Sequence, residues 1–331
     1  MTERADMAGA LHVTNGDSTD VNGTGLADRL LVWFDVLHEG PVPAVVDDEF
    51  RRVRADHLTS ADEEAGWEFV VDRFVRRDQT LDANRDGTYV LWFEADLYDQ
   101  LQIAQILARL AALDVPADRI TLICIGEYPG IGHFGGLGEL TADQLRELPA
   151  TAACAALTPA ALELASMAWS ALRAPDPEGL AAIADVRSGE LRFLAEAFDR
   201  LSREYPSTRD GLSLTERRIV AAVDGHRGAG EVFGRVAHRE ARPFLGDTWC
   251  FAAMDRLVRA PAPLLAADPA GVRVGRHSRL RRTDMGARVL AGREDHIRHN
   301  GIDRWVGGVH LHSDGIDWRF DEGTETITRH R

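Results

Sequence analysis

The chain contains no lysine, and all 38 of its basic residues are arginine, which reflects coding composition more than mechanism. Cysteine is scarce as well. Cys124, Cys154 and Cys250 lie far apart and show no CxxC spacing. This pattern argues against a disulfide framework and against a cysteine-based zinc site. We expect three buried apolar thiols.

Long apolar runs are also missing. No stretch approaches the roughly 18 uncharged residues that a membrane span needs. The first ten residues lack both a basic segment and the apolar core of a signal peptide. We therefore expect a cytoplasmic protein with no membrane partner. A length of 331 residues, with 45% apolar positions, is enough for two domains or more.

The charge is unevenly distributed along the chain. The net charge of -15 argues against non-specific binding of nucleic acid by the whole molecule. Residues 1–225 hold 20 Arg against 39 acidic residues, whereas residues 226–304 hold 15 Arg against 9. This asymmetry supports a separate C-terminal domain.

Apolar segments alternate with helical patterns in the first half of the chain. Apolar residues recur at three- and four-residue spacing between Asp47 and Val75, which predicts two helices, and again from Leu97 to Leu113. Four apolar segments predict strands: Leu11–Thr14, Leu31–Phe34, Tyr89–Phe93 and Ile120–Ile125. Strands that are apolar on both sides are typical of parallel sheets. We predict an α/β domain over residues 1–150, with a mostly parallel sheet and helices on both faces in a Rossmann-like arrangement.

The rest of the chain predicts three further units. Residues 151–210 have a helical pattern throughout. Residues 211–292 predict a winged-helix-like α+β domain. A capping box at Ser213 and Glu216 starts the first of three helices, and a hairpin and a last helix follow them. The helices are Leu214–Val223, Ala229–His238 and Thr248–Arg259, and the last helix resembles the Thr283-x-x-Gly286-x-x-x-Leu290 ending of such domains. Residues 293–331 predict one terminal hairpin that turns at Ser313-Asp314-Gly315.

Polar side chains follow each predicted strand of the first domain. Because ligands bind beyond the carboxyl ends of parallel strands, we expect a polar small-molecule site there, in an enzyme or a binding protein. Crowded carboxylates raise one another's pKa unless a positive charge neutralises them. That charge could come from a divalent metal, with His38 as a further metal ligand, or from a basic group of the bound molecule. The candidate ligand-binding residues are Asn15, Gly16, Glu39, Glu94, Asp96, Asp99 and Glu127.

Asp35, His38 and Asp17 are the candidate catalytic residues. Asp35 follows four apolar residues, where an acid is costly unless it is hydrogen-bonded or functional. Gly16-Asp17-Ser18 with Asp35-x-x-His38 also resembles the motifs of GDS-type serine hydrolases, although those enzymes place the Asp-x-x-His block late in the domain.

Structural interpretations compete with these roles. Asp96 could serve only as a helix cap, Asp99 could face water, and Asp17 could form an Asx-turn. His12 is expected to be a hydrogen-bonded core residue. The glycine-rich stretch Gly126 to Gly138 is either a mobile lid or anion cradle, or a surface loop.

Three ordered motifs resemble one bacterial family. They are His12-x-x-Asn15-Gly16-Asp17, Trp33-x-Asp35-x-Leu37-x-x-Gly40-Pro41 and Leu91-Trp92-Phe93-Glu94-x-Asp96-Leu97-x-Asp99-Gln100-Leu101. Together they resemble the uncharacterised family called domain of unknown function 1835, over roughly residues 10–150. The helical middle and Gly301-Ile302-Asp303-Arg304-Trp305 are similar to regions that accompany that domain. The resemblance implies an architecture and brings no established activity.

A run of arginines in the C-terminal domain suggests a second class of function. No acid lies between Val272 and Thr283, a stretch that holds Arg273, Arg276, Arg279, Arg281 and Arg282. Such a wing suits a phosphate backbone. The third helix, however, offers few side chains for base edges, and Trp249 and Phe251 suit a core or a protein partner. The alternative function is therefore a ligand-responsive regulator that contacts DNA or a protein partner.

Overall fold

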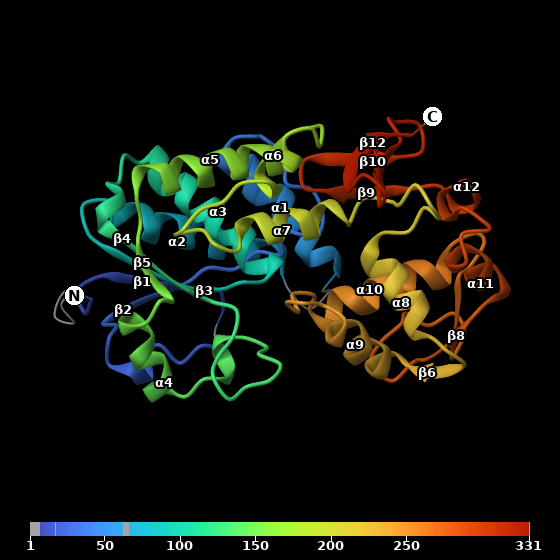
Figure 1. The fold of residues 1–331 in the computed structure, drawn as a ribbon, viewed down its shortest axis with the longest axis horizontal. Helices are drawn as coiled ribbons and strands as arrows, with labels where there is room; N and C mark the ends of the chain where they lie inside the picture. Colours follow the sequence, from blue (N-terminus) through green and yellow to red (C-terminus); the bar gives the residue numbers. More distant parts are fainter. Residues whose placement is uncertain (1–6, 17, 62–65, 331) are drawn as a thin grey trace.

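The structure is a computed structural model that describes residues 7–16, 18–61 and 66–330 (Figure 1). Its N-terminal part is built on a five-stranded sheet in the order β2-β1-β3-β4-β5. The first four strands in this order are parallel, and the edge strand β5 is antiparallel to β4. The strands are β1 (Leu11–Thr14), β2 (Arg29–Val32), β3 (Tyr89–Glu94), β4 (Ile120–Ile125) and β5 (Cys154–Ala156). The predicted mixed α/β fold with a mostly parallel sheet is confirmed.

The two faces of the sheet pack against different layers. Alternate side chains of a strand point to opposite faces. Tyr89, Leu91 and Phe93 accordingly enter one core, and Val90 and Trp92 enter another. The first face is covered by α1 (Asp47–Ala61), α2 (Trp67–Ala83), α3 (Leu97–Ala112) and α5 (Pro159–Arg173). The second face is covered by α4 (Ala142–Glu147) and by loops, so helices lie on both faces but unequally (Figure 1).

The strand β5 was missed in the sequence because it is short and lies at the sheet edge, where none of its three side chains is fully buried. It carries Cys154, which is only half-buried, whereas Cys124 and Cys250 are buried as predicted. All three thiols are free. The predicted core role of His12 is confirmed, because its two ring nitrogens are hydrogen-bonded to Met7 O and to Trp92 Nε1.

The helical middle of the chain packs on the same core as the sheet. The helices after β5 are α5, α6 (Leu180–Ala184) and α7 (Leu194–Ser202). α3 packs against both α5 and α7. Leu172 and Phe198 are buried in the core that also holds Leu91 of β3. The helical segment therefore extends the first layer of the N-terminal part.

A second hydrophobic core lies within residues 212–290. Its helices are α8 (Leu214–Ala222), α9 (Ala229–His238), α10 (Asp247–Arg259) and α11 (Asp284–Leu290). An antiparallel sheet of order β6-β8-β7 completes it, with β6 (His226–Gly228), β7 (Leu265–Asp268) and β8 (Arg279–Arg282). The predicted capping box of Ser213 and Glu216 opens α8. The three predicted helices, the hairpin and the last helix are observed, and only β6 was missed.

The C-terminal tail forms two hairpins, so the prediction of one is wrong. After α12 (His296–Asn300), the hairpins pair β9 (Asp303–Val306) with β10 (Val309–His312), and β11 (Trp318–Asp321) with β12 (Thr326–Arg329). The first hairpin turns at Gly307-Gly308, where Gly308 N donates to Leu172 O at the end of α5. A Cβ on Gly308 would lie 2.2 Å from Arg173 O. This close approach lets the turn dock on α5.

Within the described part of the chain, every helix is too short or too polar to cross a membrane.

Candidate functional site

Two polar loops meet at the carboxyl edge of the sheet. β1 and β3 are neighbours, but the chain continues from β1 to β2 on one side of the sheet and returns to β3 on the other. In open parallel sheets, ligands bind where the strand order reverses in this way. Asn15 follows β1, and its Nδ2 donates to Asp99 Oδ1 in the first turn of α3 at 2.6 Å. This hydrogen bond joins the two loops.

Three acidic side chains gather beside Asn15, and we call Glu94, Asp96 and Asp99 the carboxyl cluster. Asp96 is the N-cap of α3 and accepts a hydrogen bond from Asp99 N at 2.9 Å, so the predicted cap is confirmed. The carboxylate of Asp99 is fully buried and also accepts from Glu94 N. The prediction that Asp99 could face water is therefore wrong. The side chains of Glu94 and Asp96 also share a hydrogen bond, so hydrogen bonds link all three residues of the cluster.

Burial raises the pKa of every member of the carboxyl cluster. Desolvation, followed by the neighbouring charge of Asp96, raises the pKa of Glu94 to about 8. Desolvation also raises the pKa of Asp96 to about 6, against the effect of its backbone hydrogen bonds. The pKa of Asp99 is raised well above its ordinary range by the same cause and by its two acidic neighbours. A carboxylic acid that keeps its proton at neutral pH can donate it to a ligand.

The structure offers no metal site to accompany these carboxyl groups. Among the described residues, no group of three or more His, Cys, Asp or Glu side chains is arranged to hold a metal ion. The positive charge near the cluster comes from Arg242, which lies between α9 and α10. Arg242 Nη1 donates to Gly126 O at 3.0 Å, and its charge lowers the pKa of Asp96 against desolvation.

The glycine-rich loop, residues 126–138, folds over the carboxyl cluster. Leu137 N donates to Glu94 Oε1 at 2.6 Å. Gly136 has a φ of 142°, and a Cβ there would lie 2.5 Å from Glu94 Oε2. A Cβ on Gly126 would collide with Arg242 Nη1 and with Ala95. Glycine is therefore required where the loop touches the cluster, and the cavity left beneath the loop is about 20 Å³, roughly the room of one water molecule.

A larger cavity of about 370 Å³ opens beside this covered cluster. We call it the strand-end cavity. It shares Ile125 and Gly126 with the small cavity, and Tyr128 and Phe193 contribute aromatic walls. Arg192 lines it and donates from Nη2 to Cys124 O at 2.9 Å, which leaves its other nitrogens without a partner among the described residues. Its volume lies in the range of small-molecule sites, about 300–1,000 Å³.

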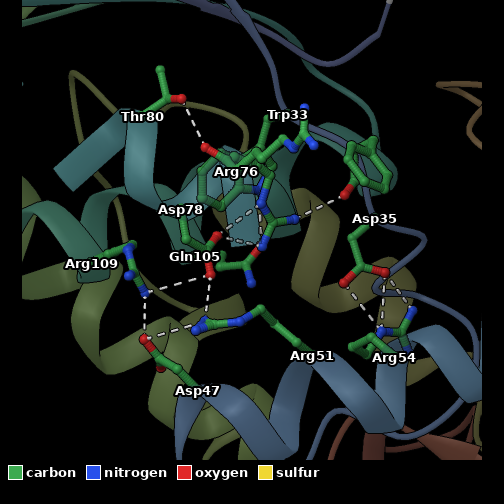
Figure 2. A network of polar contacts seen from close by, with 12 residues as sticks. Trp33, Asp35, Asp47, Arg51, Arg54, Arg76, Asp78, Thr80, Gln105 and Arg109 are labelled. Atoms are coloured by element: carbon green, nitrogen blue, oxygen red, sulfur yellow. Dashed lines mark hydrogen bonds and ion pairs between the residues drawn. The ribbon is translucent and has the colours of Figure 1, made fainter. Parts of the chain in front are cut away.

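Asp35 lies apart from the carboxyl cluster, in a buried ion pair with Arg54 (Figure 2). Arg54 Nη2 lies 2.7 Å from Asp35 Oδ1, and both side chains are fully buried. The same guanidinium donates to the carbonyl oxygens of Val36, Glu39 and Pro41. The ion pair and its hydrogen bonds thus offset the free-energy cost of burying the Asp35 carboxylate. Arg54 also holds the turn of residues 36–41 in place.

His38 lies between the first turn of α3 and the C-terminal part of the chain, and Glu39 lies near charged residues of that C-terminal part. The His38 ring contacts Phe244 at 5.0 Å and Tyr98 at 5.9 Å between ring centres. Neither of its nitrogens has a hydrogen-bond partner among the described residues. Burial, together with the charge of Arg54, lowers its pKa to about 3, so the ring is neutral at physiological pH. For Glu39, burial raises the pKa against the charges of Arg256 and Arg304.

The structure therefore divides the predicted site residues into two groups. Asn15, Glu94, Asp96 and Asp99 come together, and Glu127 lines the strand-end cavity next to them. Gly16 accepts a hydrogen bond from Thr14 Oγ1 in the loop after β1. Asp35, His38 and Glu39 form the second group, and Asp17 lies outside the described residues. The catalytic role of Asp35 and His38 stays a prediction, although their surroundings favour a structural one.

Sequence reasoning missed the arginines that complete the site. Arg192 and Arg242 flank the ring of Phe193, at 5.2 and 4.7 Å from its centre, and each donates to a carbonyl at the end of β4 or just beyond it. Their positions depend on packing between distant segments, and no local spacing marks them. Arg54 was similarly hidden among the other arginines of α1.

The predicted wing arginines lie on and before β8. Arg276, Arg279 and Arg281 are exposed and form no ion pair with a described acidic residue, and Arg282 Nη1 donates to Val220 O. The third helix of this part, α10, packs against α1 of the N-terminal part. Trp249 of α10 stacks on His57 of α1 with ring centres 4.8 Å apart. Trp249, in the first turn of α10, is thus partly covered by α1.

Comparison with models of known protein families gives no match for this chain, and comparison with curated proteins gives none either.

Proposed function

We propose that the chain binds a small polar molecule in the strand-end cavity and exchanges a proton with it through Glu94. The observation that carries the proposal is the adjacency of a ligand-sized cavity to the carboxyl cluster, through the shared residues Ile125 and Gly126. Glu94 lies beneath the loop and does not line the strand-end cavity, so the proton that its pKa of about 8 holds at neutral pH would reach the ligand through the water-sized cavity. Arg192 suits an anionic group of the ligand, and Tyr128 suits a flat one.

The finer architecture belongs to the same proposal. We propose a Rossmann-like arrangement for the N-terminal part, since its strand order reverses between β1 and β3. We propose a winged-helix-like arrangement for residues 211–292, since three helices precede a small antiparallel sheet. The resemblance of residues 10–150 to domain of unknown function 1835 agrees with a site at the strand ends and stays a proposal.

A bulky residue in the strand-end cavity tests the proposed binding. Ala152 is exposed and lines the cavity, so Ala152→Trp fills it without disturbing the core. Compounds found by ligand-observed NMR from a library of small polar molecules should lose binding by about tenfold or more in this variant. Ala160→Trp, at an exposed alanine in the first turn of α5, is the matched control and should bind as the wild type does. Equal binding by both variants would remove the cavity from consideration.

A regulator that contacts DNA is the second candidate. The exposed arginines around β8 favour it, and the packing of α10 on α1 opposes it, because that helix would have to enter the major groove. In such a regulator, the segment from Arg242 to Phe244 would connect the carboxyl cluster to the domain that carries the exposed arginines. Arg242 lies at the carboxyl cluster, and the ring of Phe244 contacts His38.

Salt-dependent binding of duplex DNA tests this second candidate. The wild type should bind more weakly by about tenfold or more when salt rises from about 50 to about 200 mM. Replacement of Arg279, Arg281 and Arg282 by Ala should abolish binding in a fluorescence anisotropy titration. An absence of binding by the wild type at low salt would exclude the candidate.

A further inference from the structure

A second ligand-sized cavity lies on the second half of α3, between that helix and α1, α2 and α5. Its volume is about 460 Å³, within the range of small-molecule sites, about 300–1,000 Å³. It shares no lining residue with the strand-end cavity. The carboxyl cluster lies at the start of α3, whereas this cavity is lined by residues of its second half, Gln105, Ala108, Arg109 and Ala112. We call it the α3 cavity.

The aspartates of the α3 cavity are already neutralised by arginines. Asp82 receives hydrogen bonds from Arg109 Nε and Nη2, each at 2.7 Å. Asp78 receives one from Arg77 Nε at 2.9 Å and one from Arg51 Nη1 at 3.0 Å, and Figure 2 shows the pairing of Arg51 with Asp78. Four carboxylate oxygens are thus occupied, and the cavity holds little acceptor capacity for a ligand.

Asp47 lies at the exposed mouth of the same network. Its Oδ2 accepts from Arg109 Nη1 at 2.7 Å, as Figure 2 shows. The lining holds three aspartates and three arginines, and the nearby Arg51 also pairs with Asp48, at 3.0 Å. The charges of the lining balance, but Arg173 forms no ion pair with a described carboxylate and is available to an anionic ligand.

The groups that remain without partners are donors. Gln105 accepts from Trp33 Nε1 through its Oε1 at 2.9 Å, and its Nε2 donates to none of the described residues. Arg173 donates from Nε to Pro43 O and from Nη2 to Val45 O, and its Nη1 has no partner in the described part of the chain. A ligand that complements these groups brings acceptor atoms and a negative charge.

Aromatic rings form the rest of the wall. The Arg173 guanidinium lies 5.2 Å from the ring centre of Trp169 and 5.5 Å from that of Phe50. The two rings meet edge to face, with centres 5.8 Å apart. A flat apolar group on the ligand can pack against these rings while its anionic end meets Arg173.

We propose that the α3 cavity binds a small organic oxyanion, a carboxylate or a phosphate ester that bears a flat apolar group. Its donors are Gln105 Nε2 and Arg173 Nη1. The site is independent of the strand-end cavity, so ligands of the two cavities do not compete for the same residues.

Four small probes of similar shape test the proposal by titration calorimetry on the full chain at low salt. Benzoate and phenyl phosphate are the anions, benzamide is the neutral control and benzamidine the cationic one. At least one anion should bind about tenfold more tightly than both controls. The tighter of the two anions identifies the carboxylate or the phosphate as the preferred group.

Three variants locate the binding. Arg173→Gln should weaken anion binding by about tenfold or more. Arg76→Gln removes the same charge from an exposed arginine of α2, which among the described acidic residues pairs with Asp72 alone, and this variant should bind as the wild type does. Ala112→Trp blocks the cavity from its exposed rim without removing a charge, and it keeps the test valid if Arg173→Gln does not fold.

The proposal is overturned by any of three results. The first is the absence of anion binding at millimolar concentration. The second is binding of benzamide or benzamidine as tight as that of the anions. The third is anion binding that Ala112→Trp leaves unchanged, or that Arg76→Gln weakens as much as Arg173→Gln does.

Discussion

Replacing Arg54 with Met should lower the free energy of unfolding of the N-terminal part by about 3–5 kcal/mol, because it leaves Asp35 buried without its counter-charge. Arg54 and Asp35 are both fully buried and form a bidentate contact. The loss also removes the donor to Val36 O, Glu39 O and Pro41 O. Chemical denaturation followed by circular dichroism measures the change.

Two controls separate this effect from a general loss of positive charge. Arg76→Met is the same substitution at an exposed site in α2 and should cost less than about 0.5 kcal/mol. The double variant Asp35→Leu with Arg54→Met should recover part of the loss, because no uncompensated charge remains. Equal destabilisation by Arg54→Met and Arg76→Met would contradict the structural role of the ion pair.

Replacing Glu94 with Gln should stabilise the chain increasingly as the pH rises from 5 to 8. The ordinary pKa of 4.5 rises to about 8 in the folded chain. The stability contributed by the bound proton is therefore complete below pH 4.5 and is lost as the pH rises through 8. Glutamine is neutral at every pH, and its side-chain oxygen still accepts the hydrogen bond from Leu137 N. The variant therefore avoids the loss of stability, which is on the order of 1–3 kcal/mol in the wild type.

The measurement is the difference in melting temperature between Glu94→Gln and the wild type at pH 5 and at pH 8. Glu163→Gln, at an exposed position of α5, is the matched control and should show the same small difference at both values. A Glu94→Gln difference that does not change with pH would mean that Glu94 is ionised in the folded chain.

The central strands β1, β3 and β4 could be predicted from the sequence because they are buried on both faces. Tyr89–Glu94 and Ile120–Ile125 read as continuous apolar runs, and α3 has both a clear periodicity and a cap at Asp96. The missed strands β5 and β6 are three residues long and have no fully buried residue, so they carry no such signal. Their existence depends on neighbouring strands.

The site could be predicted only in part, for a related reason. The strand-end rule brings together side chains that follow neighbouring strands, and it placed Asn15 beside Asp99 correctly. It failed for Asp35, because a buried acid can be neutralised by an arginine far along the chain. Arg54 comes nineteen positions after Asp35, and this separation hides the pairing from a local pattern. The terminal hairpin was mispredicted because the Gly307-Gly308 turn depends on its contact with α5.

The most direct test of the strand-end site is the titration of Glu94 itself. Carbon-13 NMR of side-chain carboxyl groups in labelled protein follows the titration, and the signal missing from Glu94→Gln identifies the residue. The predicted midpoint is about 8, which would show that the sheet edge keeps a protonated acid at neutral pH beside a ligand-sized cavity. A midpoint near the ordinary 4.5 would contradict the proposed site.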